Sequence, residues 1–141
     1  MAEFSVLLVD DEPDFRETLE RRLKKRNLDA RGVPSGEEAL KALKERPVDV
    51  VVLDVKMPGL GGLGTLREIR KNFPLVEVIM LTGHANMEVA LEGMELGAFD
   101  YLMKPMDIDE LLYKLQDAFR KKSMQEKKQK RHQNQTAPAS D

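Results

Sequence analysis

The sequence predicts an α/β fold in which a five-stranded parallel sheet carries helices on both faces, and two observations lead to this prediction. Short apolar runs alternate along the 141-residue chain with segments of helical periodicity. Three of the runs, FSVLLV, VDVVVLDV and VEVIML, are rich in β-branched residues and nearly continuous. Such runs are typical of strands that are buried on both faces of a parallel sheet.

The expected strands and helices follow one another in the order (βα)5, which implies right-handed crossovers within a single doubly wound domain. The strong strands are expected at residues 4–9, 48–55 and 76–81. Two weaker runs, at residues 28–33 and 98–103, complete the sheet, and the first of them is expected at an edge.

Helical periodicity fills the gaps between the strands. In the first gap Phe15, Leu19 and Leu23 recur at one-turn spacing, which predicts a stripe that faces the core. Residues that favour a helix start precede three of the helices: Pro13, the capping-box pair Ser35 and Glu38, and the pair Asp107 and Glu110.

Composition excludes several classes of protein. The chain is 41% hydrophobic and 34% charged, with no Cys and two His. Without Cys there is no disulfide, Cys-ligated zinc site, iron–sulfur cluster or thiol catalysis, and any metal must be bound mainly by oxygen. No apolar run approaches the roughly 18–20 residues that cross a bilayer, and the start, MAEFSVLLVDDE, lacks the features of a signal peptide. We therefore expect a cytoplasmic protein with no membrane partner.

The net charge of −2 conceals an uneven distribution along the chain. Residues 120–141 contain seven Lys or Arg and two acidic residues. Residues 1–119 contain 16 Lys or Arg and 23 acidic residues. Near residue 122 the apolar periodicity stops and the sequence becomes rich in Gln and Lys. We expect one domain at residues 1–121 and a basic, polar tail at residues 122–141, either disordered or a frayed extension of the last helix.

Acidic residues follow two of the strong strands. The first strand ends in Asp10, Asp11 and Glu12, and the third ends in Asp54. Ligands of open α/β sheets bind outside the carboxyl ends of the strands, so these carboxylates share a pocket if the two strands are neighbours. Carboxylates about 4 Å apart repel by roughly 4 kcal/mol at an effective dielectric constant near 20, and such a cluster needs a cation or a shifted pKa. With no soft ligands in the chain, the natural cation is Mg²⁺.

The fourth and fifth strands add a hydroxyl and an ammonium group at the same edge, from Thr82 and Lys104. Carboxylates, a hydroxyl and a lysine around a hard metal suit the handling of a phosphoryl group, with one carboxylate as nucleophile. Each of these residues alone is more often a cap or a solvated surface residue. Their joint placement at four strand ends favours a functional site.

Four segments carry a resemblance to a known family: LLVDDE, VVVLDVKMPGLGGL, MLTGHA and GAFDYLMKPMDIDEL. Together they resemble the response-regulator receiver domain of two-component signalling, over roughly residues 3–121. The resemblance implies a flavodoxin-like sheet with strand order 2-1-3-4-5. It also implies a signalling phospho-acceptor that catalyses only its own phosphotransfer and autodephosphorylation, and is no enzyme toward other substrates.

The resemblance assigns roles to the acidic residues. Asp54 matches the phospho-acceptor, which takes a phosphoryl group from a histidine of a sensor kinase or of a histidine phosphotransfer protein. Asp54 also belongs to the implied Mg²⁺ site, where Asp11 matches the direct ligand and Asp10 the ligand that acts largely through water. The backbone carbonyl of Lys56 completes the implied protein ligands.

The remaining implied roles concern the switch. Thr82 matches the hydroxyl that moves toward the phosphoryl group, and Lys104 matches the ammonium that pairs with it. Tyr101 matches the aromatic residue that turns inward when Thr82 moves, which alters the surface of the fourth helix, fifth strand and fifth helix. Lys104 and Pro105 match the cis peptide of the family.

The sequence also departs from the family pattern at the start of the third helix, where Gly61 stands in place of a common Asp. Two further positions border the expected phosphoryl group, because Lys56 and His84 lie two residues beyond Asp54 and Thr82. We hypothesise that these two side chains set the rate of dephosphorylation through the access of water.

Three other functional classes agree less well with the positions of these residues. A phosphatase of the haloacid-dehalogenase type needs a second Asp where Lys56 stands. A P-loop or Rossmann domain needs its glycines after the first strand, whereas the segment PGLGGLG follows the third. A phosphorylation-independent interaction module of the same fold is disfavoured by the presence of Asp11, Asp54, Thr82 and Lys104.

The output of the expected switch stays open. About 20 residues follow the last expected helix of the domain, so we favour a stand-alone receiver over a fragment of a longer transcriptional regulator. The segment GAFDYL…KP…DIDEL nevertheless resembles receivers that precede ATPase-type transcription activators. We expect no nucleic-acid partner, because the basic tail lacks a recognition motif, and a phosphorylation-dependent dimer stays open.

Overall fold

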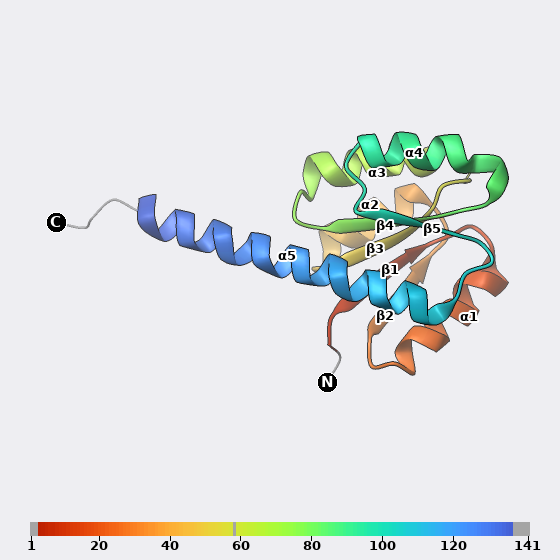
Figure 1. Ribbon diagram of the computed structural model, residues 1–141, viewed down its shortest axis with the longest axis horizontal. Helices are drawn as coiled ribbons and strands as arrows, with labels where there is room; N and C mark the ends of the chain where they lie inside the picture. Colours follow the sequence, from red (N-terminus) through yellow and green to blue (C-terminus); the bar gives the residue numbers. More distant parts are fainter. Residues whose placement is uncertain (1–2, 58, 137–141) are drawn as a thin grey trace.

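The computed structural model describes residues 3–57 and 59–136 and alternates strands with helices along the chain (Figure 1). The elements are β1 (Ser5–Val9), α1 (Pro13–Lys24), β2 (Asp29–Val33), α2 (Gly36–Glu45), β3 (Val50–Asp54), α3 (Gly61–Asn72), β4 (Glu77–Thr82), a 3-10 turn (His84–Asn86), α4 (Met87–Glu95), β5 (Asp100–Met103) and α5 (Ile108–Thr136). Within these described ranges, no helix is both long enough and apolar enough to cross a membrane.

The five strands form one parallel sheet in the order β2-β1-β3-β4-β5. This order confirms the predicted doubly wound α/β fold and places β2 at an edge, as expected. The pairing of Val9 with Leu53 brings the ends of β1 and β3 side by side. Asp10, which follows β1, and Asp54, the last residue of β3, are therefore neighbours by the register of the sheet.

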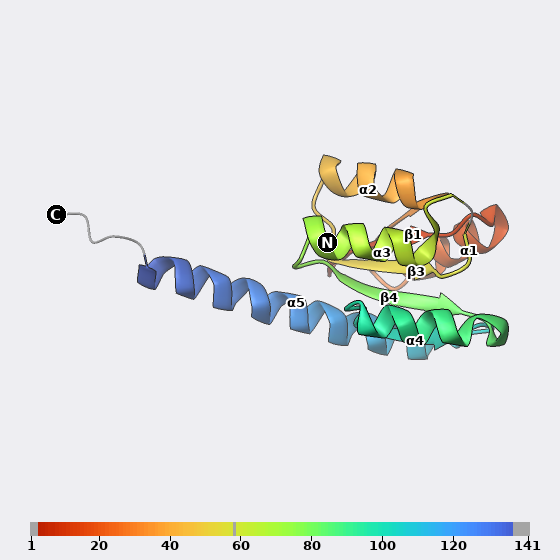
Figure 2. The same ribbon diagram turned by 90° about the horizontal axis from the view of Figure 1, so that it is seen from above.

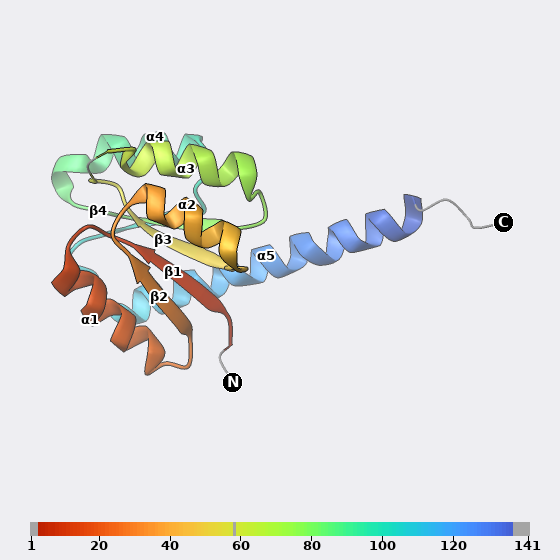
Figure 3. The same ribbon diagram turned by 180° about the vertical axis from the view of Figure 1, so that it is seen from behind.

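Helices cover both faces of the sheet, which lies between them in Figures 1 and 3. On one face α1 and α5 bury residues such as Leu19, Leu23 and Leu115 against β1, β3 and β4. On the other face α2, α3 and α4 bury residues such as Leu66 and Ala90. β1, β3 and β4 are therefore enclosed on both faces, which explains why their sequences are continuously apolar.

The helix starts show which local signals act. The Ser35 hydroxyl accepts a hydrogen bond from the Glu38 N–H at 3.1 Å, so the capping contact predicted from this pair is confirmed at the start of α2. α3 instead begins at Gly61 with no side-chain cap. Gly61 has a φ of +75°, a left-handed conformation that glycine adopts without a steric penalty. The glycine thus gives the chain its sharp turn into α3 in place of a capping side chain.

The last helix runs far past the sheet, as Figures 1 and 2 show. Of the two alternatives for residues 122–141, the structure has the helical one as far as Thr136, because α5 is continuous from Ile108. Residues 137–141 of the expected tail lie outside the described residues. The domain and its tail are therefore joined by a single helix.

Ion pairs fix α5 where it leaves the domain. The Lys122 ammonium lies 2.7 Å from a carboxylate oxygen of Asp49, and the Lys121 ammonium lies 3.4 Å from one of Glu77. Burial lowers the pKa of Lys122, but the hydrogen bond and charge of Asp49, with a smaller contribution from Glu126, outweigh it and raise the pKa. Both carboxylates flank the amino ends of strands, Asp49 just before β3 and Glu77 at the start of β4, so α5 is fastened at that end of the sheet.

The close packing of α3 on β3 gives a first prediction. A Cβ atom added at Gly62 lies 2.6 Å from both the Cα and the carbonyl oxygen of Val55, and this backbone cannot move aside cheaply. We expect Gly62→Ala to lower the free energy of unfolding by about 1–3 kcal/mol, measured by urea denaturation. Gly83→Ala is the control, because a Cβ there meets nothing within 4 Å. Equal stability of the two variants contradicts the prediction.

Candidate functional site

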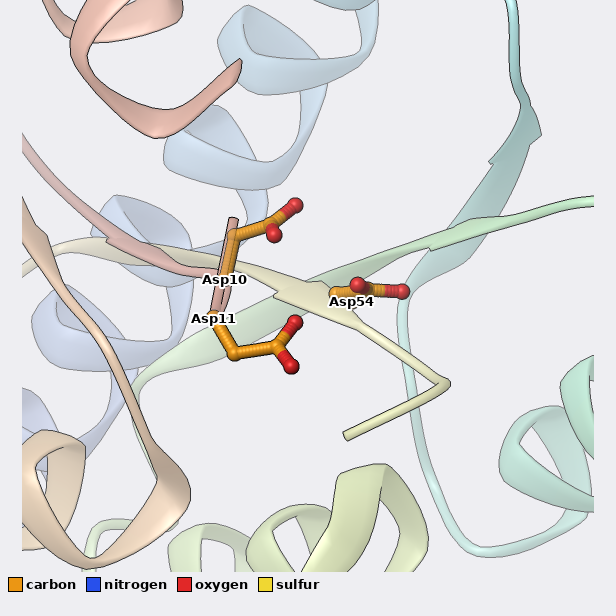
Figure 4. Close-up of side chains that lie close together, drawn as sticks. All are labelled: Asp10, Asp11 and Asp54. Carbon is orange, nitrogen blue, oxygen red and sulfur yellow. The ribbon is translucent and has the colours of Figure 1, made fainter. Parts of the chain in front are cut away.

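Three carboxylates converge at the carboxyl end of the sheet (Figure 4). Asp10 and Asp11 directly follow β1, and Asp54 is the last residue of β3. One oxygen from each residue can be chosen so that all three lie within 4.8 Å of one another. Asp10 and Asp54 are nearly buried, whereas Asp11 is exposed. The structure thus brings together the three acidic residues that the sequence predicts.

The charge on Asp54 is held in an unfavourable setting. Burial is the largest effect on its carboxyl group and raises its pKa above the ordinary value of 3.8, with smaller contributions in the same direction from Asp10 and Asp11. The Lys56 N–H, which donates to Asp54 Oδ1 at 3.1 Å, and the Lys104 ammonium lower the pKa without restoring it. The pKa of Asp54 therefore stays raised.

Lys104 reaches this cluster from the end of β5. Its ammonium lies 3.2 Å from Asp10 Oδ2 and 3.7 Å from Asp54 Oδ2. Its backbone N–H donates to the Thr82 carbonyl at 2.8 Å, and the peptide bond between Lys104 and Pro105 is cis. One cation is thus shared between two carboxylates.

The two residues expected to switch belong to β4 and β5, the strands beyond β3 in the sheet. The buried Thr82 hydroxyl at the end of β4 donates a hydrogen bond to the Gly83 carbonyl at 3.1 Å. Tyr101, in β5, is partly buried and packs against the core layer of α2, α3 and α4. Lys56 and His84 are exposed. The positions agree with the sequence pattern, while the roles assigned to these residues stay predictions.

Two residues of α1 contact the site although the sequence pattern did not single them out. The Phe15 ring lies 4.2 Å from the Lys104 ammonium, and the Arg16 guanidinium donates to the Asp10 carbonyl at 2.8 Å. Phe15 matched a core stripe with Leu19 and Leu23, so its periodicity concealed this contact. The position of Phe15 in the first turn after the acidic residues was the available signal.

The carboxylates line an open cavity of about 540 Å³. Its walls are formed by the acidic residues and Lys104 together with four further residues from the surrounding loops: Lys56, Met57, Gly83 and Asn86. All of the charged ligand atoms are carboxylate oxygens, the donors that a hard divalent cation prefers. The cavity can therefore hold a hydrated cation next to a small anionic group.

Comparison with known proteins decides the family. The family model described as the response regulator receiver domain matches residues 6–116. The chain belongs to the response regulator receiver domain family. Receiver domains are signalling domains of two-component systems. The fold and the family predicted from the motifs are therefore confirmed.

Relatives of this receiver domain are regulators of the NtrC and NtrX types. A DNA-binding transcriptional regulator NtrC of Escherichia coli (strain K12) is 37% identical over 136 residues, which are 96% of this chain and 29% of the relative. A putative response regulator NtrX-like of Rickettsia felis is 38% identical over 120 residues, 84% of this chain and 25% of the relative. The chain thus spans about a quarter of the length of these curated relatives.

Solved structures show the same architecture. A response regulator receiver domain protein from Clostridium thermocellum superimposes with a TM-score of 0.82 at 34% identity, covering 88% of this chain and 98% of that one. NtrX from Brucella abortus superimposes with a TM-score of 0.85 at 29% identity, over 100% of this chain and 32% of that one. The second match includes the whole length of α5.

The crowded carboxylates of this receiver domain give a second prediction. Asp54→Asn removes a carboxylate whose pKa is raised, so we expect it to increase the free energy of unfolding at pH 7 by about 1 kcal/mol. The gain is fully present above the raised pKa of Asp54, shrinks as the pH falls from there toward 3.8, and is lost below 3.8, where the carboxyl is protonated in both the folded and the unfolded state. Urea denaturation in EDTA across this pH range measures it.

Asp29→Asn serves as the control for this measurement. Asp29 pairs with Arg46 at 2.9 Å, but both side chains are about half exposed, and such surface pairs contribute little. We expect its effect at pH 7 to stay below about 0.5 kcal/mol. A loss of stability in Asp54→Asn at pH 7 contradicts the interpretation of the cluster.

Proposed function

We propose that this receiver domain accepts a phosphoryl group on Asp54 from a phosphohistidine of a sensor histidine kinase or histidine phosphotransfer protein, in a Mg²⁺-dependent reaction. The observation that carries the proposal is the position of Asp54, nearly buried between two further carboxylates and the Lys104 ammonium. Membership of the family supports it independently. A carboxylate in this setting is available as a nucleophile.

In the proposed transfer, a carboxylate oxygen of Asp54 attacks the phosphorus atom. A P–O bond forms, the P–N bond to the donor histidine breaks, and the electron pair returns to the imidazole nitrogen. The Lys104 ammonium, 3.7 Å from Asp54 Oδ2, is placed to offset the negative charge of the phosphoryl oxygens. The product is an aspartyl phosphate.

The chain offers a donor set that fits Mg²⁺. The carboxylates of Asp10, Asp11 and Asp54 are hard oxygen ligands within reach of one another, and Lys56 lies on the wall of the same cavity. We propose that these carboxylates and the Lys56 carbonyl hold the ion, which when bound offsets the charge of the carboxylates and the phosphoryl oxygens.

Phosphorylation adds a group with a charge of about −1.5 to −2 and three acceptor oxygens, and this change is the proposed switch. The Thr82 hydroxyl, which now donates to the neutral Gly83 carbonyl, gains a charged acceptor. We propose that its movement frees space for Tyr101 and shifts the population of the α4, β5 and α5 surface between two packings. The partner of this surface and a phosphorylation-dependent dimer stay predictions.

The relatives bear on the whole protein. The matched segment is 29% of NtrC, a DNA-binding transcriptional regulator, so a fragment of such a regulator is an alternative to a stand-alone receiver. In both cases the proposed task of the described residues is the same, to convert the phosphorylation of Asp54 into a change of surface. A cytoplasmic location stays a prediction.

Incubation with acetyl phosphate and Mg²⁺, followed by intact-mass measurement, tests the proposed function. We expect one phosphoryl adduct, its loss in Asp54→Asn or EDTA, and formation at least about tenfold slower in Lys104→Met, which lacks the positive charge. Lys24→Met is the matched control, because its exposed ammonium pairs with Glu20 far from the cavity. An adduct that persists in Asp54→Asn rules out the assignment.

The exposed side chains of Lys56 and His84 give a further prediction. Each lies two residues beyond a residue of the site, and we propose that truncation of either side chain gives water easier access to Asp54. We expect Lys56→Ala and His84→Ala to shorten the lifetime of the phosphoryl group by about two- to tenfold. The loss of adduct is followed over time after removal of acetyl phosphate. Unchanged lifetimes in both variants reject the hypothesis.

A further inference from the structure

The Lys104 ammonium is enclosed by two carboxylates and an aromatic ring. Its distances to Asp10 Oδ2 and Asp54 Oδ2 are 3.2 and 3.7 Å, and its distance to the centroid of the Phe15 ring is 4.2 Å. The ring comes from α1, whereas the carboxylates follow β1 and β3. The ammonium thus meets negative charge and the electron-rich face of a ring at once.

The position of the ring is fixed by the start of α1. Pro13 occupies the first turn of this helix, and Phe15 packs against the core layer of α1 and α5. The next residue, Arg16, donates to the Asp10 carbonyl at 2.8 Å. Its stem crosses Gly32, where an added Cβ lies only 2.7 Å from Arg16 Cγ. The first turn of α1 is therefore tied to the strand that carries the acidic residues.

A lysine side chain is flexible, so a neighbouring group has to restrict its conformations if the ammonium is to stay in one position. It has four rotatable bonds, and 28% of the Lys104 side chain is exposed, so water competes for its ammonium. The face of an aromatic ring attracts an ammonium and offers it no competing hydrogen-bond acceptor. Phe15 thus occupies one side of the ammonium, while Asp10 and Asp54 lie within 3.7 Å of it.

We propose that Phe15 is a positioning residue that holds the Lys104 ammonium in place beside Asp54 for the incoming phosphoryl oxygens. The inference rests on the proposed phosphotransfer to Asp54 and adds to it a residue outside the acidic, hydroxyl and lysine positions. The competing explanation is that Phe15 is only a core residue that happens to lie near Lys104.

The two explanations differ in how Phe15 and Lys104 substitutions combine. With acetyl phosphate and Mg²⁺, we expect Phe15→Leu, which stays apolar but loses the ring, to be phosphorylated about two- to tenfold more slowly than the wild type. Phe15→Tyr keeps the ring and is expected to stay within about twofold of the wild-type rate. Urea denaturation of each variant shows that it is folded.

The decisive variant is the double substitution. If Phe15 acts through Lys104, Phe15→Leu has no further effect in a Lys104→Met background, because there is no ammonium left to hold. If Phe15 acts only through packing, its substitution slows phosphorylation by the same factor in both backgrounds. The second result overturns the inference, and so does a Phe15→Leu variant that reacts at the wild-type rate.

A measurement without phosphorylation separates this inference from the proposed function. In the metal-free protein, we expect the ring of Phe15 to shift the NMR signals of the Lys104 methylene protons next to the ammonium upfield, because the ammonium lies 4.2 Å from the ring centroid. We expect this shift to persist in Phe15→Tyr and to disappear in Phe15→Leu. Its absence from the wild type overturns the inference even if Asp54 is phosphorylated. A wild type that shows the shift but forms no adduct overturns the proposed function and leaves the contact intact.

Discussion

Repulsion among the carboxylates at the end of β1 and β3 is the constraint on which the arrangement of the site depends. Three acidic residues have oxygens within 4.8 Å of one another, and the Lys104 ammonium pairs with two of them. The acids meet because β1 and β3 are neighbours, and the lysine reaches them because β4 and β5 continue the sheet in the same direction. A strand order in which β1 and β3 are not neighbours separates the carboxylates that have to act together.

The rest of the domain tolerates this repulsion because its apolar core is separate from the site carboxylates. β1, β3 and β4 are buried on both faces, in two apolar layers that contain none of the site carboxylates. Burial keeps the pKa of Asp54 raised, so its ionised carboxylate lowers the free energy of unfolding at neutral pH. Such a cost at a functional site is compatible with a stable fold when the remaining sequence is consistent with the structure.

The sequence predicts the fold and the acidic residues well because both depend on local patterns. Strand burial appears as continuous apolar runs, and the acids stand directly after them. The contact of Phe15 with Lys104 could not be predicted in this way, because a ring in a core stripe has the same periodicity whether or not a cation lies over it. The hydrogen bond from Thr82 to the Gly83 carbonyl depends on a side-chain rotation, and α5 continues to Thr136 through residues that lack apolar periodicity. None of these three features produces a periodic pattern in the sequence.

The two ends of the sheet use the same kinds of residue with opposite results. At the amino ends of the strands, Asp49 accepts hydrogen bonds from both the Ser5 N–H and Lys122, and the buried Glu77 pairs with Lys121. Asp49 and Glu77 each pair with a different lysine of α5, and Lys122 also pairs with Glu126, so this end anchors α5. At the carboxyl ends, the clustered carboxylates share the Lys104 ammonium. Charge that is matched residue by residue stabilises a structure, whereas an excess of carboxylates over their cation leaves the site dependent on what it binds. The end at which phosphoryl chemistry is proposed is therefore set by the local balance of charge as well as by the presence of acidic residues.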